Sequence, residues 1–208
     1  MMLQVLAFST VAYAGSPTQE SGPTAAMLTG ASAPGQWDAG LALGYPWTRA
    51  RVQRGLDNGW TPFVEVDSAL YTRTRPAVGM SLPWIDRRWR VSGEATVGWL
   101  EQTGTLAERG PSGSLAMRVG RARGRVLPYL HAGTEHTLIM DRVVTDTADG
   151  EVIENVARHA WTLTGAMGVG IALGRGWGLD VGLDLPWVDV PRPSIPGIHL
   201  GVQFGGGR

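Results

Sequence analysis

Apolar residues alternate with small or polar residues over several long stretches of the chain. The clearest stretch begins at Trp161 and ends at Leu173; Leu, Met, Val and Ile occupy every second position, with Thr, Ala and Gly between them. The pattern resumes after a short turn and continues from Trp177 to Trp187. Successive side chains of a β-strand point to opposite faces, so this period of two predicts strands. The stretches exceed the roughly 5 or 6 residues of an ordinary strand and suit the roughly 9 to 11 that a tilted strand needs to cross a bilayer.

The same pattern, followed backward from the C-terminus, predicts eight strands. Their approximate ranges are 36–46, 61–84, 89–100, 113–120, 125–138, 158–173, 176–188 and 197–204. The second range keeps one parity for more than twenty residues, through Arg73, Thr74, Arg75 and Pro76. It is either one strand that protrudes far beyond the membrane or two strands with a tight turn at 72–75. Two strands would make nine and demand a tenth, so the single strand is preferred.

With eight strands, the connections alternate between short turns and long loops. The long ones are 47–61, 101–112, 139–157 and 189–196. Bacterial outer-membrane barrels have an even strand number, short periplasmic turns and long external loops. The pattern therefore predicts an all-β fold, an eight-stranded antiparallel up-and-down transmembrane β-barrel. Within the third long loop, segments 143–148 and 151–156 flank Asp149-Gly150, a common hairpin dipeptide, so the flanking strands are expected to continue as a ribbon outside the bilayer.

The tryptophans fall at the ends of the predicted strands. Indole is apolar over its ring and polar at its N–H, so it favours the two membrane interfaces. Only Trp60 lies outside both predicted girdles. The periplasmic girdle contains Trp37, Trp84, Trp89 and Trp177, and the external girdle contains Trp47, Trp99, Trp161 and Trp187.

The last predicted strand has the sequence Gly-Ile-His-Leu-Gly-Val-Gln-Phe over 197–204. Together with the loop alternation, it resembles the small outer-membrane β-barrel family that includes the OmpA membrane domain and OmpX. The resemblance covers about 36–204. It implies the outer membrane of a Gram-negative bacterium, contact with its lipid and lipopolysaccharide, and delivery to the barrel-assembly machinery through the last strand. Residues 205–208 follow as a short C-terminal tail.

Two segments precede the predicted barrel. Residues 1–14 are apolar and end in Ala-Tyr-Ala, a small-x-small pattern that predicts a signal peptide. Residues 15–35 are rich in Ser, Thr, Pro, Ala and Gly, which predicts a flexible periplasmic lead-in.

Composition limits the classes of partner and of binding site that the chain can have. The formal charge is zero, so electrostatics gives no case for nucleic acid. The chain has no cysteine, which excludes a disulfide framework and a thiolate metal site. No cofactor, metal site or catalytic residue is expected, and the barrel is expected to be monomeric.

The parity opposite the apolar one carries charges of both signs, which in a barrel line the lumen. A lone buried charge is strongly disfavoured, so these residues are expected to pair and to plug the interior. The interior of an eight-stranded barrel is barely wide enough for its own side chains. The predicted lumen residues are Asp38, Glu65, Asp67, Arg73, Arg75, Arg90, Glu94, Arg118, His131, Glu135, Asp180, Asp184 and His199.

These features favour a structural or surface-recognition barrel with an unknown external ligand. One alternative is an enzyme that modifies the acyl chains of lipid A or lipopolysaccharide, with His131 and a serine such as Ser112 or Ser114 as candidate chemistry. Against it, His131 and Glu135 share the lumenal parity, while Thr134 and His136 do not. A second alternative is a soluble periplasmic lipocalin-like carrier, whose apolar parity would point inward.

Overall fold

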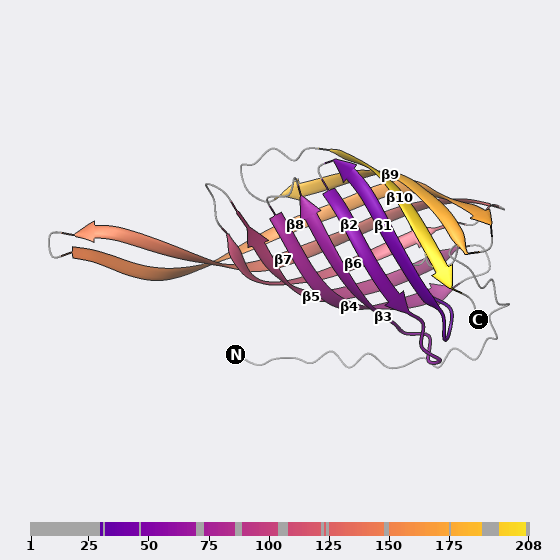
Figure 1. Ribbon diagram of the computed structural model, residues 1–208, viewed down its shortest axis with the longest axis horizontal. Coiled ribbons are helices and arrows are strands. Elements are labelled where there is room, and N and C mark those ends of the chain that lie inside the picture. The colour runs from indigo at the N-terminus through magenta and orange to yellow at the C-terminus, as the bar shows by residue number, and fades with distance from the viewer. Residues whose placement is uncertain are drawn as a thin grey trace.

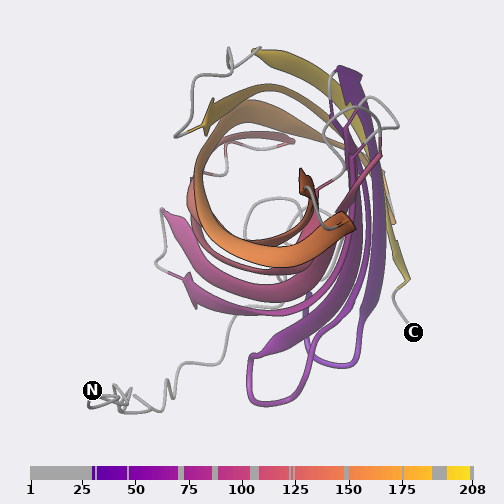
Figure 2. The same ribbon diagram turned by 90° about the vertical axis from the view of Figure 1, so that its left-hand side faces the viewer.

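The computed structural model describes residues 30, 32–45, 47–69, 73–85, 89–103, 108–121, 123, 125–147, 150–174, 176–188 and 196–206. These residues form one antiparallel sheet that closes on itself as a barrel (Figures 1 and 2). No helix in this part of the chain has the length and apolarity to cross a membrane.

Ten strands make up the described barrel, and each pairs with its neighbours in chain order. The first and last strands pair from Trp37↔Gly206 to Tyr45↔Ile198, which closes the sheet. The strands are β1 (Trp37–Tyr45), β2 (Trp47–Arg54), β3 (Thr61–Ala69), β4 (Arg73–Ile85), β5 (Arg90–Gln102), β6 (Arg109–Gly120), β7 (Val126–Thr147), β8 (Gly150–Gly174), β9 (Trp177–Val188) and β10 (Gly197–Gly206).

The predicted count of eight strands is wrong, and both errors lie between β1 and β5. The predicted single strand 61–84 is two strands, β3 and β4, which pair from Thr61↔Ser81 to Ala69↔Arg73. The predicted loop 47–61 contains β2, which pairs with β1 on one side and β3 on the other. The two additional strands keep the number even, so the directions of the later strands are unchanged.

Strand β2 escapes the sequence pattern because its outward face is only weakly apolar. That face carries Thr48, Ala50, Val52 and Arg54, while the inward face carries Trp47 and two arginines. No run of large aliphatic side chains marks either parity. The strand is instead specified by pairing, since it fills the gap between two strands that would otherwise have open edges.

The two ends of the barrel differ. At one end, which we call the turn end, lie the β2–β3, β4–β5, β6–β7 and β8–β9 connections and the described parts of both termini. At the other, the ribbon end, β7 and β8 run beyond the barrel and stay paired to Thr147↔Gly150. Figure 1 shows this β7–β8 ribbon, residues 141–155, standing clear of the other strands. The side chains of residues 141–155 lie outside the description.

The described termini pack on the barrel more closely than the sequence predicts. Gly205 and Gly206, expected in a C-terminal tail, extend β10 and pair with Asp38 and Trp37. The end of the predicted flexible lead-in lies against the inner wall at the turn end, where the Ser32 amide donates to Thr61 Oγ1 at 3.2 Å. The predicted signal peptide, 1–14, lies outside the described residues.

Candidate functional site: the charged lumen

The strand register sorts side chains into an apolar outer face and a polar lumen. Partners across an antiparallel pair share a face, so Arg49↔Asp67 and Asp67↔Arg75 place three charges in one inward row on β2, β3 and β4. Outward positions of the later strands carry aliphatic side chains; Val181 is 46% exposed and Leu183 is 45% exposed, with Leu179 on the same face. This polarity is the reverse of that in a water-soluble protein, whose apolar residues gather inside.

Arg75 is the centre of the inward charges. Its Nη2 lies 3.0 Å from Glu65 Oε1 and 3.1 Å from Asp67 Oδ2, and its Nη1 lies 3.2 Å from Glu135 Oε2. Asp67 also accepts from Arg49 Nε at 2.5 Å. The guanidinium is a planar group with five N–H donors, which suits simultaneous pairing with several carboxylates.

Three ion pairs join strands that are not neighbours. Arg51 on β2 pairs with Glu94 on β5 at 2.9 Å, and both Arg73 and Arg75 on β4 pair with Glu135 on β7, at 3.0 and 3.2 Å. Each bond spans the inside of the barrel rather than one sheet ladder. The network therefore ties β2 through β5 and β7 together across the lumen.

A second cluster lies on β7, β9 and β10. His199 Nδ1 is 2.8 Å from Asp184 Oδ2, and His199 Nε2 is 3.3 Å from Asp180 Oδ2. The Tyr129 hydroxyl donates to Asp180 Oδ2 at 3.1 Å and lies 3.1 Å from His199 Nε2. The Arg118 guanidinium carbon is 5.3 Å from the centre of the Tyr129 ring. The imidazole is thus held between two carboxylates and a phenol.

The predicted lumen residues all occupy inward positions in the register. Glu65, Asp67, Arg73, Arg75, Glu94 and Glu135 belong to the first network, and Asp180, Asp184 and His199 form the second. Of the other four, Asp38 and Arg90 lie toward the turn end, and Arg118 pairs in register with His131 at mid-height.

Sequence reasoning missed three residues of these two clusters. Arg49 and Arg51 lie on β2, which was expected to be a loop. Tyr129 shares the parity of His131 on β7, but a tyrosine in a β-barrel does not by itself indicate a lumenal partner. The alternation Arg-x-Arg at 49–51, repeated at 73–75, was the available signal for the two arginines.

A cavity of about 210 Å³ separates the charged strands from the opposite wall. That opposite wall, on β8, β9, β10 and β1, carries mostly small inward residues, such as Thr162, Thr164, Ala166 and Gly182. Adding two strands widens a barrel, and side chains as short as these leave the extra width unfilled.

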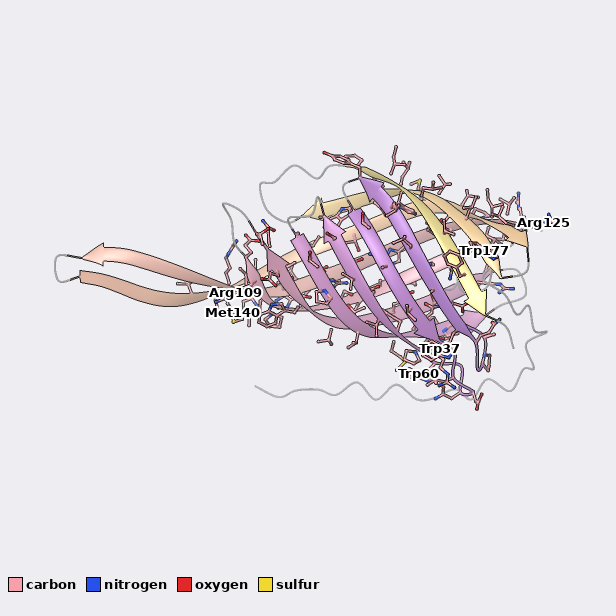
Figure 3. The ribbon with its side chains drawn as sticks, in the orientation of Figure 1. Trp37, Trp60, Arg109, Arg125, Met140 and Trp177 are labelled. Atoms are coloured by element: carbon pink, nitrogen blue, oxygen red, sulfur yellow. The ribbon has the colours of Figure 1, made fainter. Side chains whose placement is uncertain are left out.

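The outward tryptophans lie at two levels. Trp37, Trp84, Trp89 and Trp177 are exposed at the turn end, and Trp99 and Trp161 are exposed at the ribbon end. Figure 3 shows Trp37, Trp60 and Trp177 toward one end of the barrel and Arg109 and Met140 toward the other. Trp60, which the sequence left in neither group, belongs to the β2–β3 connection at the turn end. Trp187 is the last residue but one of β9, at the ribbon end, and its side chain is outside the description.

Trp47 departs from the predicted girdle. It pairs in register with Ala69 on the inward face, and its ring centre is 5.5 Å from the Arg73 guanidinium carbon. It therefore lines the cavity instead of facing outward. The assignment of a loop to 47–61 left no strand parity from which this direction could be derived.

The candidate hydrolase residues do not assemble as a serine–histidine pair. Ser114 Oγ lies 2.5 Å from Thr96 Oγ1. His136 points outward and contacts His159, 2.9 Å between ring nitrogens. Among the described residues, no hydrogen bond joins His131 to a serine or threonine, and no group of three or more His, Asp or Glu side chains is arranged to hold a metal ion.

No protein-family model matches the sequence, and no curated protein matches it. Among solved structures, the chain is similar to the N-terminal β-barrel domain of Pseudomonas aeruginosa OprF, with a TM-score of 0.42, 12% identity, and coverage of 82% of this chain and 96% of that one. It is also similar to the KdgM porin in complex with disordered oligogalacturonate (TM-score 0.41, 11% identity, coverage 81% and 98%). A third similar structure is Neisserial surface protein A (TM-score 0.35, 15% identity, coverage 81% and 94%).

Proposed function

We propose that this chain is a barrel of the bacterial outer membrane, with a lumen braced by paired charges and a surface-recognition role carried by the β7–β8 ribbon. The observation that carries the proposal is the inverted polarity of the wall. Aliphatic side chains such as Leu130, Val97 and Leu200 are more than half exposed on the outside, while charges pair inside. Contact with the hydrocarbon core of a bilayer would remove this apolar face from water.

The spacing of the tryptophans supports a bilayer of ordinary thickness. Trp89 precedes β5 and Trp99 lies toward its other end, and Trp177 and Trp187 lie at the two ends of β9; both pairs are ten residues apart. At about 3.3 Å per residue and a tilt of roughly 35–45°, ten residues span about 23–27 Å of height. Transmembrane barrels have an apolar band about 25 Å tall between their aromatic girdles.

The inward polarity argues against the lipocalin-like carrier. A carrier for an apolar ligand needs a cavity lined by apolar side chains. This cavity is lined by Arg49, Arg75, Glu65 and Asp67 among others. The acyl-modifying enzyme receives no support from the positions of His131, Ser112 and Ser114.

The ribbon is the part of the barrel best suited to recognition. Beyond Met140 on β7 and Thr162 on β8, the described strands pair only with each other, so both edges of the ribbon are open to an added strand. Residues 141–155 carry five carboxylates and one arginine. Charge complementarity therefore favours an extended, basic segment of another surface molecule as the partner. Lipopolysaccharide and outer-membrane lipid are the proposed surroundings, and β10 the proposed contact for the assembly machinery.

Protease sites at the two ends test location and orientation together. A site inserted between Asp149 and Gly150 is expected to be cut on intact cells, whereas one inserted at Gly59 in the β2–β3 connection is expected to be cut only after the outer membrane is permeabilised. Heat-modifiable migration of the detergent-extracted protein serves as the folding control. Cleavage of both sites without permeabilisation, or extraction without detergent, would contradict the proposal.

A further inference from the structure

The segment just before β1 enters the lumen at the turn end. We call Gly30 together with Ser32–Gln36 the plug segment. Arg51 Nη2 donates to the Gly30 carbonyl at 2.9 Å, and Gln53 Nε2 donates to Ser32 Oγ at 3.0 Å. The Ser32 amide donates to Thr61 Oγ1 at 3.2 Å. Gln53 and Thr61 are inward and buried, so the segment occupies space inside the barrel.

Two glycines allow this close approach. Gly30 has φ +62°, and a Cβ built on it would lie 1.9 Å from Glu94 Oε1. On the barrel side, a Cβ on Gly55 would lie 2.0 Å from the Ala33 carbonyl oxygen. A Cβ at Gly55 would meet backbone atoms, and one at Gly30 would meet the Glu94 carboxylate, which Arg51 holds, so a side chain at either position disturbs the seated segment. Gly35, by contrast, has φ +74° and no atom within 4 Å of a built Cβ.

The seated segment leaves polar atoms without partners. Glu94 Oε1, against Gly30, and Gln36 Oε1 are buried and have no hydrogen-bond partner; the same is true of the inward hydroxyls of Ser81 and Ser92 on the neighbouring wall. Buried polar atoms without partners destabilise the state that buries them. Water entering in place of the segment would satisfy Glu94 and Gln36, which lowers the free energy of a displaced state.

On the ribbon-end side of the plug segment, the lumen contains two cavities. The cavity of about 210 Å³ and a second of about 90 Å³ share Arg49, Arg118 and Asp180 in their linings. The smaller cavity lies on the turn-end side of the larger and has Gly30 in its lining. The plug segment therefore lies where these spaces would continue to the turn end.

We infer that the plug segment is displaceable and that its displacement turns the barrel into a conduit for small hydrophilic ions and solutes. The inference rests on the proposed membrane-spanning role. Both charge signs line the spaces, so the conduit is expected to pass cations and anions with weak selectivity. The paired arginines remain as the wall of the conduit, and the plug segment, not the ion-pair network, sets whether it is open.

Bilayer conductance of matched glycine variants tests this inference. The Gly30→Val substitution is expected to expel the segment and, through the three hydrogen bonds lost, to raise open-state occupancy in a planar bilayer by at least about tenfold. Gly35→Val introduces the same side chain and the same left-handed backbone strain without a clash, and is expected to raise conductance far less than Gly30→Val. A Gly30→Val protein that is heat-modifiable but conducts no more than the unmodified protein would overturn the inference.

A thiol at Ser32 gives a second measurement that is independent of the membrane. The chain has no cysteine, so Ser32→Cys introduces a unique thiol. In detergent, maleimide is expected to label this thiol slowly in the otherwise unmodified chain and at least about tenfold faster when Gly30→Val is added. Equal rates would overturn the inference. A protein that does not insert into bilayers but still shows the tenfold difference in labelling rate would overturn the proposed function. The displacement of the plug segment would remain supported.

Discussion

Strands β2 to β5 line the lumen with charged side chains, whereas β8, β9, β10 and β1 line it mainly with glycine, alanine and threonine. The outer faces differ in the opposite sense. On β8 and β9 large aliphatic residues fill the outward positions, while β2 offers only Thr48, Ala50, Val52 and Arg54. One half of the wall is therefore specified by its contact with the surroundings, and the other by ion pairs across the interior.

The largest loss of stability is expected from replacing Arg75, because three carboxylates of the charged half pair with this one side chain. Replacing Arg75 with Met leaves Glu65, Asp67 and Glu135 with less compensation inside the barrel. Removing one partner of a buried ion pair lowers the free energy of unfolding by about 3–5 kcal/mol. Urea unfolding in lipid vesicles measures the change. The outward Arg54→Met is the control and is expected to change stability by less than about 1 kcal/mol; equal losses in the two variants would remove the distinction between the two faces.

A smaller effect, dependent on depth, is expected on the aliphatic face. Met167 lies outward on β8, midway between Trp161 and Leu173, and Leu173 lies outward near the turn end of the same strand. Arginine at mid-bilayer destabilises a barrel by about 2–4 kcal/mol, and arginine near the interface by about 0–1 kcal/mol. Comparison of Met167→Arg with Leu173→Arg in the same vesicles measures the difference. A soluble surface would give no dependence on depth.

The smallest effect is expected from filling the small-residue wall. A Cβ at Gly182 would lie 2.5 Å from His199 Cε1 and 2.9 Å from the Met167 carbonyl oxygen, so Gly182→Ala must displace the imidazole from its carboxylates. Overpacking of this kind destabilises by about 1–3 kcal/mol. At Gly40 the nearest atom is 4.0 Å away, and Gly40→Ala is expected to be nearly neutral. Thermal melting of both variants, followed by heat-modifiable migration, checks the contrast.

The sequence predicted best the half of the wall whose outward positions carry large aliphatic residues. The alternation from Trp161 to Trp187 gave β8 and β9 and their outward faces, and Asp149-Gly150 gave the paired extension of the ribbon. The inward positions of Arg73, Arg75, Asp180 and His199 followed from the same parity. The class, an antiparallel up-and-down barrel, was therefore predictable, although the strand number was not.

The rest depended on interactions between distant segments. The pairing of Arg51 with Glu94 joins residues 43 apart in sequence, and no local pattern around Arg51 marks it as lumenal. The turn between β3 and β4 interrupts a parity that continues unchanged on either side, so one long strand and two short ones have the same alternation. The entry of Gly30 into the lumen was missed because a glycine-rich segment has the same composition whether it is flexible or packed.

The direction of the aliphatic face is the central claim, and spin labels on β9 measure it most directly. Because the chain has no cysteine, single cysteines at Val181, at Leu183 and at the inward, uncrowded Gly40 of β1 each carry one label. In liposomes, labels at 181 and 183 are expected to be relaxed strongly by oxygen, which dissolves in hydrocarbon, and weakly by a water-soluble nickel chelate. The inward label at 40 is expected to be less accessible to oxygen than either. Stronger relaxation of 181 and 183 by the nickel chelate than by oxygen would contradict a lipid-facing wall.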